Sequence, residues 1–285
     1  MEVFGIDIET DAGGRWRLYP IGDPHIDEAK CNRKRLNQYL KLIASDPHGI
    51  WVCVGDWISG TTPTHKFFEF GSFDPGIIMR GDDYIAACML EVERTFEPLR
   101  DRPGVCLQGN HDLRFGGTKW SGFGWEIARR LGATYARDEC LFKVGANSRG
   151  TTSSKGRRYY WTVHAHHGAG GGYKPGGKVN RYQDTTAARI DADIHIRGHV
   201  HDSDARILPI RTLTKRRPWK LLKRPKAWVT APSFVEHISE GVHDYSSRSA
   251  FPVADEGIIY LEIANPNMGK DREWSGRIIR RECEF

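Results

Sequence analysis

Short apolar runs that end in the same kind of polar group recur between residues 22 and 201, and this feature most narrows the fold. Each run is typical of a buried strand, and Asp, Asn or His follows it at once, usually beside Gly. The five groups are Gly22-Asp23-Pro24-His25, Gly55-Asp56, Gly109-Asn110-His111-Asp112, His164-Ala165-His166-His167-Gly168 and Gly198-His199-Val200-His201. In α/β folds the carboxyl ends of strands converge on one crevice, where ligands bind. The pattern predicts one polar site built from five strand ends.

The order of the expected elements indicates an α/β fold with two packed sheets. Helices are expected at Asn32–Ala44 and Asp82–Leu99, where apolar residues recur at helical spacing, and also at Trp120–Leu131 and Lys178–Arg189. Strands are expected at Arg15–Ile21, Trp51–Val54, Val105–Gln108, Leu141–Val144, Tyr159–His164, Asp193–Ile196, Ala205–Ile210, Trp228–Thr230, Ile258–Ile263 and Arg277–Glu282. An alternation of strands and helices followed by a strand-rich half favours layered α and β structure.

We expect one domain over residues 1–285, with its core from about residue 15 to 285. Two stretches have the composition of loop insertions rather than of a separate domain. Residues 59–81 mix polar, aromatic, Gly and Pro residues and form a candidate lid. Residues 215–226 (KRRPWKLLKRPK) form a basic loop with seven basic residues in twelve.

Charge and targeting signals narrow the setting in which the chain works. The net charge of +6 and the pI near 9.0 favour an anionic partner such as nucleic acid or a phosphorylated substrate. Met1–Thr10 lacks the basic start and apolar core of a secretory signal, and no apolar run is long enough to span a bilayer. The six cysteines form no C-x-x-C pair. We therefore expect a cytoplasmic protein with free thiols and no membrane partner.

The side chains at the strand ends suit a metal centre. Carboxylate, amide and imidazole donors without a thiolate favour Mn²⁺, with Fe or Zn²⁺ as alternatives. Seven donors are too many for one tetrahedral ion, but they suit two ions that share a bridging carboxylate. The seven are Asp23, His25, Asp56, Asn110, a histidine near position 167, His199 and His201.

The ordered motifs D-x-H, G-D, G-N-H-D, H-G and G-H-x-H, over about Leu18–Asp202, resemble those of the calcineurin-like metallophosphoesterases. The resemblance implies a two-sheet αββα sandwich with two divalent metal ions. It implies that Asp23, His25 and His201 hold one ion. It implies that Asn110, His167 and His199 hold the other, and that Asp56 bridges them. His111 would act as a general acid or a charged stabiliser, and Asp112 would orient it.

Some assignments stay open. Of the middle histidines, His167 precedes Gly as the family pattern asks, and His166 is the competitor. Arg114, Lys174 and Arg181 are candidate contacts to a substrate phosphate. The glycine-rich run 168–177 either cradles phosphate or is a flexible loop. The basic run 215–226 either binds a nucleic-acid backbone, with Trp219 for stacking, or is a solvated hairpin.

The N-terminal motif D-x-E-T at Asp7–Thr10 resembles the first motif of two-metal exonucleases, but the further Asp motifs of that class are missing in order. An N-terminal strand or arm is the simpler interpretation. His65 matches no motif, but its loop follows Asp56.

The resemblance also narrows the reaction. Protein phosphatases of this superfamily carry G-D-x-V-D-R-G, whereas here Ser59 replaces the second Asp and no Arg follows. The pattern is more like the phosphodiesterase and nuclease branches and the compact enzymes of phages and mobile elements. We expect hydrolysis of phosphodiesters in DNA, RNA or a nucleotide by metal-activated water. The alternatives are a phosphomonoesterase, acting on a small molecule or a nucleic-acid end, and a metal-binding scaffold protein.

Overall fold

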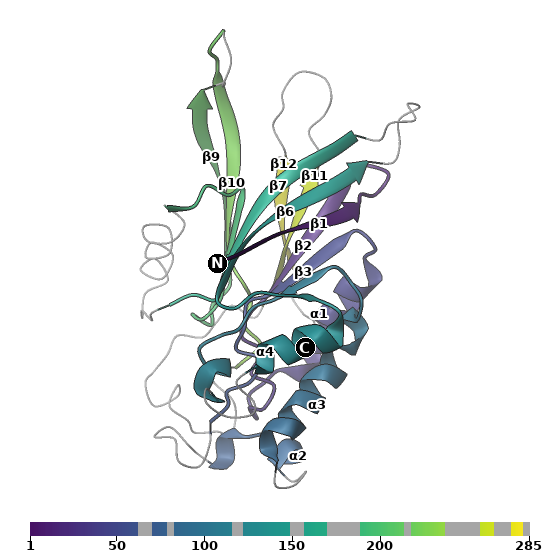
Figure 1. The fold of residues 1–285 in the computed structure, drawn as a ribbon, viewed down its shortest axis with the longest axis vertical. Coiled ribbons are helices and arrows are strands. Elements are labelled where there is room, and N and C mark those ends of the chain that lie inside the picture. The colour runs from purple at the N-terminus through teal and green to yellow at the C-terminus, as the bar shows by residue number, and fades with distance from the viewer. Residues whose placement is uncertain are drawn as a thin grey trace.

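Two six-stranded sheets pack face to face in the computed structural model of the chain (Figure 1). The structure describes residues 1–61, 70–78, 83–115, 122–148, 157–169, 189–213, 218–236, 257–264 and 275–281. The mixed α/β architecture with two sheets confirms the expected fold class. The chain enters sheet A with its first strand, builds most of sheet B, returns to sheet A and ends in sheet B. The expectation of a single domain over the whole chain stays a prediction.

Sheet B has the order β12-β11-β2-β3-β4-β5. Its strands are β2 (Arg15–Ile21), β3 (Gly49–Cys53), β4 (Gly104–Cys106), β5 (Thr134–Tyr135), β11 (Ile258–Ala264) and β12 (Ser275–Arg281). β2, β3, β4 and β5 run parallel, and β11 and β12 are antiparallel to their neighbours. β3 is buried along its whole length, as expected for a central parallel strand.

Sheet A has the order β1-β6-β7-β8-β10-β9. Its strands are β1 (Glu2–Glu9), β6 (Glu139–Ser148), β7 (Arg157–His166), β8 (Ile194–Arg197), β9 (Asp204–Leu213) and β10 (Leu221–Thr230). β7, β8 and β10 are parallel, so their carboxyl ends lie at one edge. The segment with the D-x-E-T motif is an edge strand, β1, that pairs in parallel with β6.

Three helices cover the outer face of sheet B (Figure 1). α1 (Arg33–Ser45) starts where the Asn32 side chain accepts a hydrogen bond from the Arg35 N–H at 2.9 Å. α3 (Tyr84–Phe96) starts in the same way at Asp83 and passes into a 3₁₀ turn at Pro98. α4 (Phe123–Leu131) ends at Gly132, whose left-handed φ of +67° suits glycine.

Two apolar layers result from this arrangement. The layer between the sheets contains Trp16, Val52, Phe142 and Trp161, and the two indoles meet edge to face with their ring centroids 5.5 Å apart. The layer between sheet B and the helices contains the apolar faces of α1, α3 and α4. The sheets are therefore held against each other at a fixed spacing, and loops from both reach the same edge.

Most expected elements are present, with shifted bounds. The helix expected over 178–189 falls almost entirely outside the described residues. The basic run 215–226 is not simply a loop, because Leu221–Lys226 is part of β10, which pairs antiparallel with β9. Its predicted binding of a nucleic-acid backbone stays a prediction. Of the candidate lid, the described part contains α2 (Pro75–Ile78), and its closing role stays a prediction. Among the described residues, no helix is long and apolar enough to cross a lipid bilayer.

Candidate metal centre

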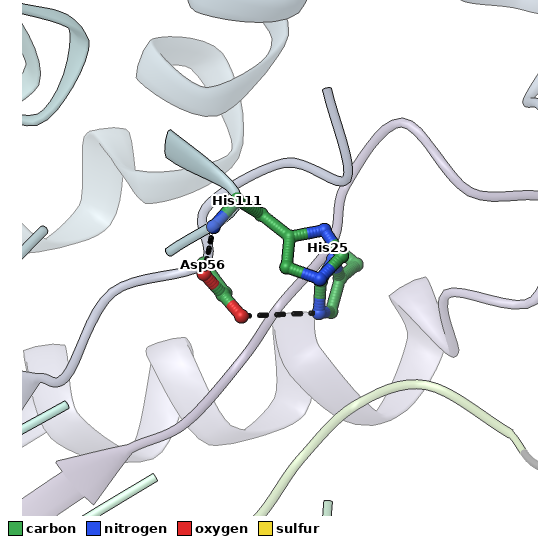
Figure 2. A group of neighbouring side chains, drawn as sticks. All are labelled: His25, Asp56 and His111. Atoms are coloured by element: carbon green, nitrogen blue, oxygen red, sulfur yellow. Dashed lines mark hydrogen bonds and ion pairs between the residues drawn. The ribbon is translucent and has the colours of Figure 1, made fainter. Parts of the chain in front are cut away.

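The carboxylate of Asp56 is shared by two groups of possible metal ligands, and Figure 2 shows it with His25 and His111. Asp56 follows β3, and its side chain belongs to two groups of possible metal ligands whose donor atoms lie within 4.8 Å of one another. One group adds His25 and His111, and the other adds His167 and His199. Asp56 Oδ2 is 3.8 Å from His25 Nε2 and 3.4 Å from His167 Nε2. One carboxylate thus faces histidines from both sheets.

The predicted ligands of one ion come from the loops after β2 and β8. His25 Nε2 and His201 Nε2 are 3.3 Å apart, and His201 Nε2 is 4.0 Å from Asp23 Oδ2. Asp23 Oδ2 accepts a hydrogen bond from the His199 backbone N–H at 2.7 Å. The structure therefore brings Asp23, His25 and His201 close to one another, as the motifs predict.

The predicted ligands of the other ion come from the loops after β4, β7 and β8. His167 Nε2 lies 2.9 Å from Asn110 Oδ1, and its ring centroid is 5.2 Å from that of His199. His167 Nδ1 donates to the Val54 carbonyl at 2.8 Å, which directs Nε2 toward the site. His166 instead accepts a hydrogen bond from the Gly168 N–H at its own Nδ1. The geometry favours His167 over His166.

The backbone of this site is left-handed at most of the predicted ligands. Six described non-glycine residues have positive φ, and five of them are predicted ligands: Asp23, His25, Asp56, His199 and His201, with φ between 38° and 69°. This conformation is unfavourable for residues with a Cβ and is found mainly where surrounding structure imposes it. Strain concentrated on five polar residues indicates a site selected for function rather than for stability.

Two glycines allow the strand-end loops to touch. A Cβ on Gly109 would stand 2.0 Å from Asp56 Oδ1. A Cβ on Gly55, whose φ is +102°, would stand 2.3 Å from the backbone nitrogen of Gly109. Only glycine permits this approach, so the Gly in the G-D and G-N-H-D motifs has a steric role.

Asp112 differs from the expectation that it orients His111. Its buried carboxylate accepts hydrogen bonds from the backbone N–H groups of Asp56 at 2.9 Å, Trp57 at 3.0 Å and Gly109 at 2.7 Å. It therefore fixes the loop that carries the central carboxylate and ties it to the neighbouring loop. The Asp112 carboxylate thus accepts hydrogen bonds from backbone N–H groups and not from the imidazole of His111.

The ring of His111 is held by other groups. Its Nδ1 lies 3.0 Å from the Ser59 carbonyl, and its Nε2 lies 3.2 Å from Arg114 Nη2. Because a guanidinium only donates, the contact makes Nε2 the acceptor and leaves the hydrogen on Nδ1 to donate to Ser59. Arg114 Nη1 also donates to the Ser59 carbonyl at 2.8 Å. Arg114, predicted to contact substrate, thus lies directly beside His111.

Sequence reasoning missed Asp27 and Tyr84. The buried Asp27 carboxylate accepts hydrogen bonds from the Ser59 N–H at 2.6 Å, the Gly60 N–H at 3.0 Å and the Tyr84 hydroxyl. These bonds fix the peptide whose carbonyl contacts both His111 and Arg114. The only signal in the sequence was a further Asp two residues after the D-x-H motif, where a turn was equally plausible.

The electrostatics of the site fit bound cations. Burial, together with the nearby Asp56 carboxylate, raises the pKa of Asp23 to about 7. Burial disfavours charge on His167, but Asp56 outweighs it and raises the pKa of His167 to about 10. Asp23 Oδ1 and Asp56 Oδ2 are buried and accept no hydrogen bond from the described residues. Two buried carboxylates with oxygens left open in this way are well suited to divalent ions.

The spacing of donor atoms fits as well. Ligand atoms about 2.1 Å from one metal ion and at right angles to each other lie about 3 Å apart. The 2.9 Å between His167 Nε2 and Asn110 Oδ1 and the 3.3 Å between His25 Nε2 and His201 Nε2 match this. Lys174, Arg181 and His65 lie outside the described residues, so their predicted or suggested places at the site stay predictions.

Comparison with known proteins gives one family. A model of the calcineurin-like phosphoesterases matches residues 17–203, which span all the motifs. No curated protein matches the chain. A solved structure titled "GAP50 the anchor in the inner membrane complex of Plasmodium" is similar at 11% identity. That similarity covers 93% of this chain and 84% of that one, with a TM-score of 0.46.

Proposed function

The chain belongs to the calcineurin-like phosphoesterase family, and on this premise we propose that it hydrolyses phosphodiester bonds in nucleic acids or nucleotides. Membership implies metal-dependent phosphoester hydrolysis. Two parts of the proposal go beyond membership: that the substrate is a phosphodiester, and that the metal is Mn²⁺. The phage-type branch stays a prediction, because the family match does not distinguish branches.

The position of Asp56 carries the proposal. Its carboxylate is shared by the group with His25 and His111 and by the group with His167 and His199. A carboxylate between two sets of imidazole donors is what a bridged pair of ions requires. Asp23, His25 and His201 would complete the shell on one side, and Asn110, His167 and His199 on the other. When bound, the ions supply Lewis acidity and lower the pKa of coordinated water.

The chain's own residues would bind and orient the substrate. Arg114 offers a guanidinium beside the centre, a group that suits a phosphate oxygen. His111 keeps a proton on Nδ1 through the Ser59 carbonyl, so Nε2 would act as a general acid toward a leaving group only when it also carries a proton. Nε2 lies 3.2 Å from Arg114, and both groups would act on the same phosphate.

The substrate preference rests on chemistry around the centre. The stretch Gly55–Gly60 lacks the arginine of the protein-phosphatase motif, and Ser59 contributes a backbone carbonyl that contacts His111. The basic balance of the chain favours polyanionic substrates. The mixed oxygen and nitrogen donors support Mn²⁺ as the first metal to test.

The test is hydrolysis of bis-p-nitrophenyl phosphate after chelation and Mn²⁺ add-back. We expect turnover that returns with Mn²⁺ and that Asp56→Asn lacks. Asp101→Asn is the matched control, because Asp101 has a similar φ of +58° but lies at the surface. The control should keep full activity.

Two other outcomes would replace the proposal. Hydrolysis of p-nitrophenyl phosphate without hydrolysis of the diester would support the phosphomonoesterase alternative. Stoichiometric metal, measured by elemental analysis, without turnover on either compound would support the scaffold alternative. DNA, RNA and cyclic nucleotides would follow a positive diester result.

A further inference from the structure

The positive charge of the chain is concentrated in one segment. Residues 205–235 contain nine Lys or Arg and no Asp or Glu. Since the whole chain has 42 basic and 36 acidic residues, the remainder carries 33 basic and 36 acidic residues, a net charge of −3. The segment therefore supplies all of the excess positive charge of the chain. None of the predicted metal ligands lies in it, so the proposed metal centre does not explain why this charge is there.

The described part of this segment forms a two-stranded ribbon that projects from the body (Figure 1). β10 pairs with β8 only over Ala227–Thr230, whereas it pairs with β9 over its whole length. Leu221–Lys226 and Leu208–Leu213 therefore extend past the sheet as an antiparallel pair. We name these two stretches the outer ribbon. Every residue from Leu208 to Leu213 is exposed, which includes both faces of the strand.

The base and the outer part of the ribbon differ in charge balance. At the end of the outer ribbon nearest the sheet, Arg224 Nη2 lies 2.7 Å from Asp193, and Lys226 Nζ lies 2.8 Å from Asp191. Further out, Arg211 is exposed, and no carboxylate pairs with it among the described residues. Lys223 stands directly opposite Arg211 in the strand register, so two basic positions share one face. The exposed Arg211 thus lies further from the sheet than the two basic residues that pair with carboxylates.

The ribbon is poorly suited to pairing with another strand. Pro209 and Pro225 stand opposite each other and lack the N–H groups that a sheet extension would use. Prolines and charges on an edge strand are typical devices against such pairing. A second copy would also set one basic ribbon against another. Yet exposed apolar side chains at Leu213, Trp219 and Leu221 offer contact surface.

We propose that the outer ribbon binds the major groove of duplex DNA. A B-form major groove is about 12 Å wide and admits a two-stranded β-ribbon. Arg211 and the basic positions along β10 contact phosphates, and the apolar side chains contact base edges and sugars. A-form RNA has a narrow, deep major groove that excludes such a ribbon. Binding itself needs no metal, and only its link to turnover rests on the proposed function.

The test is fluorescence anisotropy with a labelled DNA duplex of about 20 base pairs, in chelator, between about 50 and 200 mM salt. Arg211→Gln with Lys223→Gln removes two basic positions of the ribbon. The matched control is Lys41→Gln with Lys143→Gln, two exposed lysines elsewhere. We expect the ribbon variant to lose about tenfold in affinity and about 2 units of salt slope, with the control unchanged. An RNA duplex of the same length, measured in the same way, should bind more weakly than the DNA duplex.

Three results would overturn the proposal that the outer ribbon binds DNA. Equal DNA affinity of the ribbon variant and the control variant would overturn the proposal. So would binding of phosphatidylserine vesicles without DNA binding, or a dimer in sedimentation that the ribbon variant loses. Hydrolysis of bis-p-nitrophenyl phosphate, measured in parallel, separates the two proposals. DNA binding without small-diester turnover removes only the catalytic one, and the reverse removes only the ribbon.

Discussion

At the scale of single residues, the candidate ligands and the strained backbone coincide. His25, Asp56 and His201 have left-handed backbone, and all three are drawn toward one centre. Without bound ions, these residues combine backbone strain with buried or crowded polar groups. A substitution that relieves this strain should therefore raise the free energy of unfolding of the metal-free chain, even though it removes a metal ligand.

This gives a prediction at His201, whose φ is +48°. In chelator, His201→Gly should be more stable than His201→Ala by about 1 kcal/mol, because both lose the imidazole but only glycine accepts this φ without strain. Urea unfolding of the two variants measures the difference. At Lys41, inside helix α1, the same pair should show the opposite order by a similar amount. An identical order at both positions would contradict the strain argument.

Asp27 carries a second prediction. Asp27→Asn replaces one acceptor oxygen with an N–H₂ group that would face either the Ser59 N–H at the Oδ1 position or the Gly60 N–H at the Oδ2 position, so the peptide carrying the Ser59 carbonyl should shift. Diester turnover should fall about 10- to 100-fold with metal content unchanged, since no ligand is lost. Tyr84→Phe, which removes only the hydroxyl contact, should have a smaller effect. Loss of metal from Asp27→Asn would instead show that Asp27 holds the ligand shell itself.

The sequence predicts those site residues that belong to a local motif, but not those whose role depends on a contact distant in the chain. Asp23, Asp56 and His199 follow strands beside glycine, and that local pattern is visible in the sequence. The role of Asp27 depends on which backbone it meets, 32 residues away at Ser59, and no local pattern encodes that distance. The partners of Asp112 were mistaken for the same reason.

At the scale of elements, the sequence predicts long elements with a strong apolar pattern, whereas it does not predict the shortest ones. The strand expected at Arg15–Ile21 agrees with β2 residue for residue. β5 has two residues and α2 has four, too few for any periodic signal. The length of β10 was underestimated, because basic residues and Pro225 are unusual in a strand unless it projects into solvent.

Neighbouring strands β7 and β8 share a buried histidine pair that gives a pH prediction. His164 Nδ1 and His195 Nδ1 are 3.2 Å apart, His164 Nε2 lies 2.9 Å from Glu139, and the His195 ring stacks on Trp228. Burial, with His164 and Lys226 nearby, lowers the pKa of His195 to about 3. The unfolded chain binds this proton near pH 6.5, whereas the folded chain does not.

The sign follows from that difference. The penalty is absent above about pH 6.5 and grows as the pH falls toward 3, so acid destabilises the fold. Between pH 7 and pH 5 the wild-type chain should lose about 1 to 2 kcal/mol more unfolding free energy than His195→Gln. Urea unfolding at both pH values measures this. Equal losses in the two proteins would mean that His195 is protonated in the folded state.

At the scale of the whole molecule, the two sheets contribute complementary halves of the candidate centre. Asp23, His25 and Asp56 follow strands of sheet B, whereas His167 and His199 follow strands of sheet A. The apolar layer between the sheets fixes their spacing, and the polar loops meet only at one edge. A metal pair at that edge would connect the sheets through shared ligands, in addition to the apolar layer. At this edge the side chains between the sheets are buried charged groups rather than apolar ones.

Metal binding should therefore stabilise the entire fold. Ions at about 100 times their dissociation constant add about 2.7 kcal/mol per site, which raises the Tm by on the order of 5–10 °C for a chain of this size. Calorimetry in chelator and after Mn²⁺ add-back measures the shift. Asp23→Asn in sheet B and His199→Asn in sheet A should each reduce it, because each sheet supplies ligands that the other cannot replace. A shift that survives one substitution and not the other would place the ions on a single sheet, and the centre would then not connect the two halves of the molecule.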